Sequence, residues 1–181
     1  NVIEKKIFEE MKEDYTAVVR GMLASQNAHL LYGCTGVNSD ILARAPIWER
    51  NLDYKCGTGH GIGFMLNVHE GPHAVRTKSI SSALDSVLQE GMIVSDEPGI
   101  YKAGKYGIRL ENILYCKKVC ESPDGTFMEF VPLTFVPLDS SLILKAELSV
   151  KEREWIVSYQ NSVCDKLKAY LSQEEYEWLC R

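Results

Sequence analysis

The chain has 181 residues and a mass of 20.4 kDa, with a formal net charge of −5 from 25 acidic and 20 basic side chains. Apolar residues make up 45% and charged residues 25% of the sequence, which excludes a disordered chain and is sufficient for a hydrophobic core. There is no basic run and no apolar stretch of about 18 residues, so neither nucleic acid nor a membrane is an expected partner.

The six cysteines have irregular spacings and no paired C-x2-C pattern. They are Cys34, Cys56, Cys116, Cys120, Cys164 and Cys180. This pattern favours neither a disulfide framework nor a structural zinc site. We therefore expect free thiols in a reducing compartment, and a cytoplasmic location.

The first part of the chain is predicted to be helical. Apolar residues recur at helical spacing over 4–31 and indicate an amphipathic helix. A loop over 33–36 and a second helix over 40–50 follow, with Pro46 in the first turn of a restarted helix. Because neither an initiator Met nor a signal-peptide pattern precedes the first helix, we expect the chain to begin inside a longer protein.

The middle of the chain is glycine-rich and then strand-like. Glycines over 58–68 indicate close backbone approach or positive φ, and 82–90 predicts a short helix that ends at Gly91. Three strand-like runs joined by Gly, Pro and Asp turns predict an antiparallel sheet. These runs are 92–95, 108–115 and 127–138.

The last forty or so residues return to helix. Ser149-x-x-Glu152 and Ser172-x-x-Glu175 are capping boxes, each of which predicts a helix start. The order of helices, then sheet, then helices indicates the α+β class.

Four segments place a histidine or carboxylate in glycine-rich or strand-like sequence, where a charge is costly unless paired or metal-bound. The segments are 57–63, 68–72, 95–101 and 107–112. Singly, each has an ordinary structural explanation, such as a loop histidine or a surface carboxylate. Together, one imidazole and two carboxylates would offer nitrogen and oxygen ligands that suit Mn, Co, Zn or Fe. Because paired hydrolytic metals share bridging carboxylates, we expect at least two more carboxylates from elsewhere.

The wording GTGHGIGFMLNVHEGP, SDEPGIY and GIRLEN resembles the motifs of the pita-bread metallopeptidases, and of cytosolic-type Xaa-Pro aminopeptidases in particular. The resemblance extends to DILARAPIWERNLDY, FVPLTFVPLDSSLI, EREWIVSYQ and EEYEWL, and so covers nearly the whole chain. It implies the curved antiparallel sheet of the pita-bread fold. Residues 1–138 would form the C-terminal portion of its catalytic domain, and 139–181 a helical extension packed on it.

The resemblance implies a site with two divalent metal ions, usually Mn²⁺, with Zn²⁺ or Co²⁺ as alternatives. His60, Glu97 and Glu111 match three of its five ligands, and the residue matching Glu97 also handles the proton of the attacking water. The implied activity is removal of the N-terminal residue from peptides with proline in the second position.

Three further residues match positions that assist the reaction. His69 matches a histidine that contacts the substrate and steadies the tetrahedral intermediate. Tyr101 and Arg109 match residues that hydrogen-bond to the ligand and proton network.

Two departures qualify the resemblance. The two aspartate ligands of the family would lie before Asn1, so we expect little activity from this chain alone. The sheet would also lack strands and leave open edges, so we expect contacts with another chain, in a homodimer of the kind this subfamily often forms, or with the missing N-terminal portion. The position four before His60 is usually histidine and is Cys56 here, which either alters recognition on the proline side or is a change without consequence. The alternatives are a non-catalytic binding module on the same fold, a metal-free amidinohydrolase and an Xaa-Pro dipeptidase.

Overall fold

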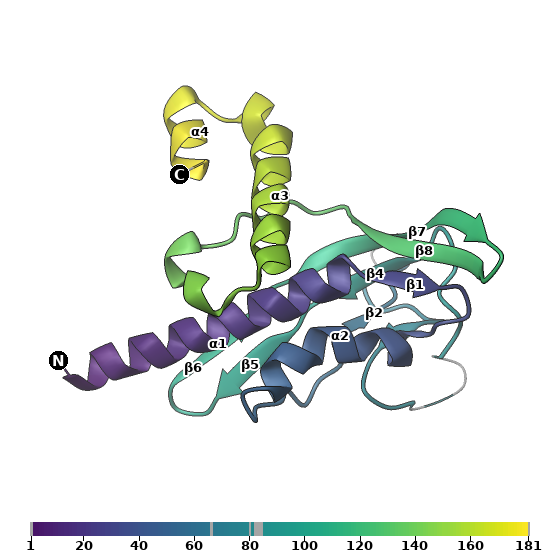
Figure 1. Cartoon of the computed structure of the whole chain (residues 1–181), viewed down its shortest axis with the longest axis horizontal. Coiled ribbons are helices and arrows are strands. Elements are labelled where there is room, and N and C mark those ends of the chain that lie inside the picture. Colours follow the sequence, from purple (N-terminus) through teal and green to yellow (C-terminus); the bar gives the residue numbers. More distant parts are fainter. Residues whose placement is uncertain (1, 66, 80, 82–84, 181) are drawn as a thin grey trace.

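The structure is a computed structural model that describes residues 2–65, 67–79, 81 and 85–180. Its centre is a four-stranded antiparallel sheet in the order β1-β8-β7-β4, which confirms the predicted antiparallel arrangement (Figure 1). Its strands are β1 His29–Leu31, β4 Ile93–Asp96, β7 Asn112–Ser122 and β8 Gly125–Pro132. Two short antiparallel ladders lie beside this sheet. One pairs β2 Gly59–His60 with β3 Ala74–Val75, and the other pairs β5 Gly99–Lys102 with β6 Tyr106–Arg109.

Two helices pack against each other and against the strands. They are α1 Val2–Gln26 and α2 Gly36–Trp48 (Figure 1). α1 places Val18, Met22 and Leu23 in the main hydrophobic core. A side chain at Gly21 would put its Cβ 2.2 Å from the carbonyl oxygen of Ala43, so the close crossing of the two helices requires a glycine there.

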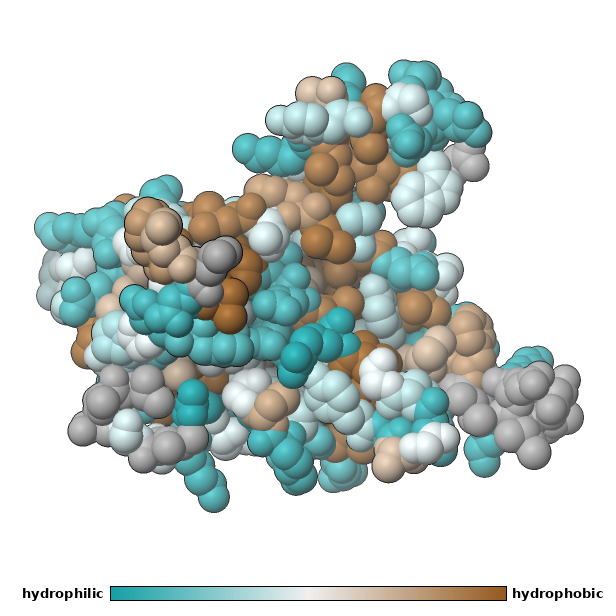
Figure 2. Space-filling view, turned by 180° about the vertical axis from the view of Figure 1, so that it is seen from behind, coloured by the Kyte–Doolittle hydropathy of each residue, from teal (hydrophilic) through white to brown (hydrophobic). Residues whose placement is uncertain are grey.

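The C-terminal part is a helical lobe on α1. It consists of α3 Val150–Leu167 and α4 Gln173–Leu179, with the short 3₁₀ helices η2 Ser140–Leu142, η3 Lys145–Glu147 and η4 Lys168–Tyr170. Val163 and Leu179 join the core that α1 forms, and Glu152 accepts from Arg20 Nε at 2.6 Å. Figure 2 shows hydrophobic side chains gathered within this lobe from the opposite side. Within the described residues, no helix is both long enough and apolar enough to span a membrane.

Both predicted capping boxes are confirmed, and the first allows a stability test. The hydroxyl of Ser149 accepts from the Glu152 amide at 3.2 Å, and Glu152 Oε2 accepts from the Ser149 amide at 2.7 Å. We expect Ser149→Ala to lower the free energy of unfolding by about 1 kcal/mol because it leaves a helix N–H without an acceptor. Urea denaturation measures the change. Ser162→Ala, in the interior of α3, is the matched control because the half-buried Ser162 hydroxyl caps no helix end and donates only to the Ser158 carbonyl. It should be neutral or slightly stabilising; equal losses in both variants would contradict the prediction.

The predicted helix boundaries in the first part are partly wrong. The first helix ends at Gln26, and 29–31 form β1 because this segment pairs with β8, with the His29 ring stacked on Phe127. The second helix begins at Gly36, where Thr35 and Asn38 form a capping box, so Pro46 lies inside a continuous helix and does not restart one.

Three predictions for the middle of the chain also need correction. Of the helix predicted over 82–90, residues 82–84 lie outside the described residues, and 85–90 are not helical because Asp85 and Val87 form bridges to His73 and Thr35. The strand predicted over 108–115 is broken at 110–111, between β6 and β7. The strand predicted over 127–138 ends at Pro132, after which the side chain of Thr134 accepts from the Ile113 amide at 2.8 Å.

The expectation of six free thiols is wrong for two of them. α4 folds back beside α3 and joins Cys164 to Cys180 in a disulfide, with a Cα–Cα distance of 6.1 Å. The spacing of 16 residues did not predict this disulfide, because the disulfide depends on the turn between the two helices. Cys34, Cys56, Cys116 and Cys120 are free.

Candidate active site

The glycine-rich segment places His60 against the edge of the main sheet. His60 pairs with Ala74 in the β2–β3 ladder, and Gly61 bridges to Val94 of β4. A Cβ at Gly59 would lie 1.9 Å from the carbonyl oxygen of Ser95, so β2 approaches β4 this closely only because residue 59 has no side chain. Gly59 therefore allows His60 to lie against β4, which confirms the predicted close approach of the backbone in this segment.

Glu97 lies directly beside His60. Its amide donates to the Thr58 carbonyl at 2.7 Å, which fixes the backbone just beyond the end of β4. One carboxylate oxygen is 3.0 Å from His60 Nε2, and the other is 3.4 Å from Arg109 Nη1. The Glu97 side chain is only 12% exposed, so these two groups provide much of its stabilisation in place of water.

The structure also assigns a role to Ser95, which the sequence reasoning did not single out. Its hydroxyl donates to Glu97 Oε1 at 3.0 Å and accepts from the His60 amide at 3.0 Å. One buried hydroxyl thus ties the carboxylate to the backbone of the histidine. The available signal was the period of two in a strand, which places residues 95 and 97 on the same face.

The other candidate residues lie around this pair. The ring centroid of His69 is 4.2 Å from that of His60. The Arg109 guanidinium is 5.7 Å from the Tyr101 ring centroid, and its Nη2 is 3.6 Å from the sulfur of Cys56. Histidine, carboxylate, guanidinium, phenol and thiol therefore gather at one place.

Glu111 is less closely held. Asp96 of β4 pairs with Asn112 of β7, so Glu97 and Glu111 are the next residues beyond this pair on the two chain segments. Glu111 is exposed, and Arg109, two residues earlier, pairs with Glu97.

The side chains of His60, Glu97 and Glu111 are of the types that bind divalent metal ions. One imidazole and a carboxylate meet at 3.0 Å, and a second carboxylate follows the same ladder. Among the described residues, however, no three His, Cys, Asp or Glu side chains are close enough together to hold an ion. His60 and Glu97 therefore fit one side of a metal site, and this part of the chain does not contain a complete one.

Three further polar residues, Glu70, His73 and Asp96, lie in or next to the same segments. His73 Nε2 is 2.8 Å from the Ile93 carbonyl, and Glu70 accepts from Asn67 Nδ2 at 2.5 Å. Asp96 is buried on β4, and burial raises the pKa of its carboxyl well above the usual range. The contacts of His73 and Glu70 hold the loops around His60.

The free thiols should differ in reactivity. Cys56 and Cys120 are exposed, whereas Cys116 is buried and burial raises its pKa to about 11. Because only the thiolate reacts, about one Cys116 in a thousand is reactive near pH 8. We expect iodoacetamide to modify Cys56 and Cys120 well before Cys116, as measured by peptide mass spectrometry. In urea, where burial is lost, all three should react alike; equal rates in the native protein would contradict the prediction.

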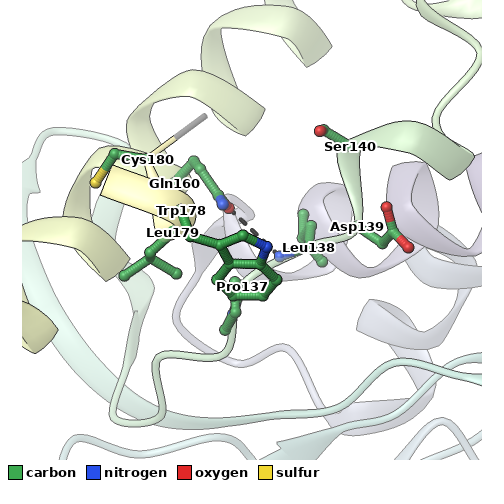
Figure 3. A pocket seen from close by; sticks show the side chains of 8 residues that line it. All are labelled: Pro137, Leu138, Asp139, Ser140, Gln160, Trp178, Leu179 and Cys180. Carbon is green, nitrogen blue, oxygen red and sulfur yellow. Dashed lines mark hydrogen bonds between the residues drawn. The ribbon is translucent and has the colours of Figure 1, made fainter. Parts of the chain in front are cut away.

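One pocket lies away from the candidate site residues. It has a volume of about 510 Å³ and is formed where α4 meets the segment before η2 (Figure 3). Its lining is Pro137, Leu138, Asp139, Ser140, Gln160, Trp178, Leu179 and Cys180. The lining is largely apolar and includes none of the predicted site residues, so this pocket carries no part of the candidate site.

The fold resembles that of solved proline-specific peptidases. X-prolyl aminopeptidase from Caenorhabditis elegans, described as a cytosolic enzyme with a di-nuclear active site, superimposes with a TM-score of 0.84 at 31% identity over 95% of this chain and 28% of that one. Xaa-Pro dipeptidase from Bacillus anthracis gives a TM-score of 0.55 at 32% identity over 72% of this chain and 32% of that one. The chain has the pita-bread fold of these metallopeptidases, as the sequence predicted.

Sequence comparison agrees with the structural one. Residues 2–118 match the model of metallopeptidase family M24, and 126–181 match the C-terminal region of peptidase M24. Aminopeptidase P1 from Arabidopsis thaliana is 43% identical over 93% of this chain and 26% of its own length. A probable Xaa-Pro aminopeptidase P from Talaromyces stipitatus is 40% identical over the same shares.

The chain belongs to metallopeptidase family M24. It spans about a quarter of the length of the curated relatives it matches. The division predicted after residue 138 stays a prediction.

Proposed function

We propose that the protein carrying this chain is a metal-dependent aminopeptidase that removes the N-terminal residue from peptides with proline in the second position. The observation that carries the proposal is the His60–Glu97 pair, 3.0 Å apart and held by Ser95 and Arg109, in a member of family M24. The relatives named aminopeptidase P1 and Xaa-Pro aminopeptidase P match 93% of this chain, and so both of its M24 regions, which favours this activity over that of a dipeptidase.

The proposed metal ligands in this chain are His60, Glu97 and Glu111. Two divalent ions, for which we propose Mn²⁺, would polarise the scissile carbonyl and lower the pKa of water at the site. The description of the worm enzyme as di-nuclear supports the number of ions. The remaining ligands would come from the part of the protein that precedes this chain.

The chain's own residues would handle protons and the substrate. Glu97 would accept a proton from the attacking water and pass it to the leaving amine, and the contact of Arg109 with one of its oxygens supports this role. His69, next to His60, would contact the substrate, and Tyr101 beside Arg109 would complete the hydrogen-bonding network. Cys56 would form part of the wall on the proline side.

The proposal is tested with the full-length protein and a panel of peptides. We expect Mn²⁺-dependent release of the first residue from Xaa-Pro-Xaa peptides, and no release when proline is in the third position. Cleavage of Xaa-Pro dipeptides alone would indicate a dipeptidase, and metal-independent hydrolysis of an amidine substrate would indicate an amidinohydrolase. No cleavage of any substrate with Mn²⁺ present would favour a binding module.

For this chain alone we expect weak metal binding and little activity. The described residues offer one close His–Glu pair and no three-ligand group, so most of the coordination shell would be missing. Equilibrium dialysis with Mn²⁺, followed by metal analysis, should find fewer than two tightly held ions per chain. The full-length protein is the comparison; two tight ions on the chain itself would contradict this prediction.

We also propose a cytoplasmic location and a homodimer. The location is supported by the cytosolic description of the worm enzyme. Size-exclusion chromatography with light scattering tests the oligomeric state.

A further inference from the structure

A separate pocket with a basic lining lies beside Cys56. Its volume is about 300 Å³, and it is lined by Arg44, residues 53–57 and residues 76–78. The β2–β3 ladder creates it, because Gly59 pairs with Val75 and the residues before β2 therefore face those after β3. A Cβ at Gly57 would lie 3.9 Å from the Cβ of Arg76 across this gap.

The lining has an excess of positive charge. It contains the cations of Arg44, Lys55, Arg76 and Lys78 and one carboxylate, that of Asp53. Asp53 is already engaged, 2.7 Å from Arg44 Nη1 and 3.6 Å from Lys55 Nζ. Arg44 is also largely engaged, since Asp40 and two carbonyl oxygens take three of its four remaining N–H donors.

Arg76 and Lys78 are therefore the cations left to bind a ligand. Within the described part of the chain neither makes an ion pair, and the Nε of Arg76 is buried without a hydrogen-bond partner. A buried N–H of this kind is costly unless something accepts from it. A carboxylate or phosphate matches the geometry of a guanidinium and would supply that acceptor.

We propose that this pocket binds an oxyanion, a carboxylate or a phosphate, through Arg76 and Lys78. As a carboxylate it would be the C-terminus of a short peptide substrate, and this reading rests on the proposed function. His60 pairs with Ala74, two residues before Arg76, which corresponds to about 7 Å along the strand. Two residues of an extended peptide also span about 7 Å, the distance from the scissile carbonyl of an Xaa-Pro-Xaa tripeptide to its carboxylate.

The pocket and the candidate site are joined through one residue. Cys56 lines the pocket, and its sulfur is 3.6 Å from Arg109 Nη2. Arg109 in turn pairs with Glu97. A peptide that reaches from Glu97 into the pocket would therefore pass Cys56, where the sequence departs from the usual histidine.

The test measures binding to the full-length protein by calorimetry after chelation has removed its metals, so that no turnover occurs and no ion binds the anion. The probes are inorganic phosphate, an Xaa-Pro-Xaa peptide with a free carboxylate, and the same peptide as its amide. We expect phosphate and the acid to bind, and the Arg76→Gln/Lys78→Gln variant to bind both about tenfold more weakly. Lys145→Gln/Lys151→Gln, which replaces two exposed lysines of η3 and α3, is the charge-matched control and should not change binding.

The outcomes separate the sources of the anion. Tighter binding of the acid than of the amide identifies the peptide carboxylate, and binding of phosphate with equal affinity for acid and amide identifies a free oxyanion. Absence of phosphate and acid binding by folded protein, or unchanged binding in the double variant with a native circular dichroism spectrum, would overturn the proposal. Because no cleavage is measured, phosphate binding can persist even if the proposed aminopeptidase activity fails.

Discussion

Glu97→Gln in the full-length protein should lower kcat for Xaa-Pro cleavage by a factor of about 10² to 10⁴, the usual contribution of a positioned acid or base. Glutamine has nearly the same size, but its amide cannot accept the proton of the attacking water. It would also present either an oxygen or an NH₂ group to His60 and Arg109, which now lie 3.0 and 3.4 Å from the two carboxylate oxygens. The loss should therefore appear in kcat, while substrate contacts at His69 remain.

Steady-state kinetics on an Xaa-Pro-Xaa peptide, with Mn²⁺ content measured for each preparation, separates a lost proton acceptor from a lost metal. Glu154→Gln is the matched control, because Glu154 is exposed on α3 and lies outside the candidate site. Its kcat should equal that of the unmodified protein. A Glu97→Gln protein with normal metal content and a kcat within threefold of normal, about 0.6 kcal/mol in barrier height, would remove Glu97 from the proposed mechanism.

The glycine-rich motif shows what the sequence can predict well. Glycines at 59 and 61 indicate close backbone approach, and the structure finds neighbouring carbonyl oxygens where their Cβ atoms would be. The capping boxes at Ser149 and Ser172 were equally local and equally reliable. In each case the determining contact lies within a few residues or is required by the absence of a side chain.

The sequence was less informative where the contacts come from distant segments. Residues 29–31 continue a helical pattern but form a strand because β8 offers its edge. Val87 has helix-compatible neighbours, yet it bridges to Thr35. The bridging role of Ser95 required the position of β2, and the Cys164–Cys180 disulfide required the turn between α3 and α4. The local sequence pattern does not predict these contacts, because each depends on how distant segments of the chain pack together.

Arg44→Met should be the most destabilising substitution around the candidate site, because Arg44 is the centre of a buried polar network. The Arg44 side chain is 3% exposed and that of Asp40 is 1% exposed, and they are 2.7 Å apart. Arg44 also donates to the carbonyl oxygens of Tyr54 and Cys56 at 2.8 Å each. These bonds hold the segment that leads into the glycine-rich motif of His60.

Methionine fills a similar volume but leaves the Asp40 carboxylate buried without its cation and two carbonyls without donors. Breaking a buried pair in this way costs about 3–5 kcal/mol. We expect a loss of this size in the free energy of unfolding, measured by urea denaturation. Lys55→Met is the matched control: Lys55 contacts the same Asp53 as Arg44, but its side chain is 92% exposed, and such surface pairs contribute about 0–1 kcal/mol.

A second variant distinguishes the cost of the unpaired Asp40 charge from the cost of the hydrogen bonds that Arg44 no longer makes. In Asp40→Asn/Arg44→Met neither member of the buried pair is charged, and the introduced amide can still accept from Thr58, whose hydroxyl now donates to Asp40 Oδ1 at 2.5 Å. The double variant should therefore be more stable than Arg44→Met alone, despite carrying one more substitution. If it is less stable, the cost of Arg44→Met comes from the freed carbonyls and the loosened 53–58 segment rather than from Asp40. The position of His60 would then depend on the hydrogen bonds of Arg44 more than on its charge.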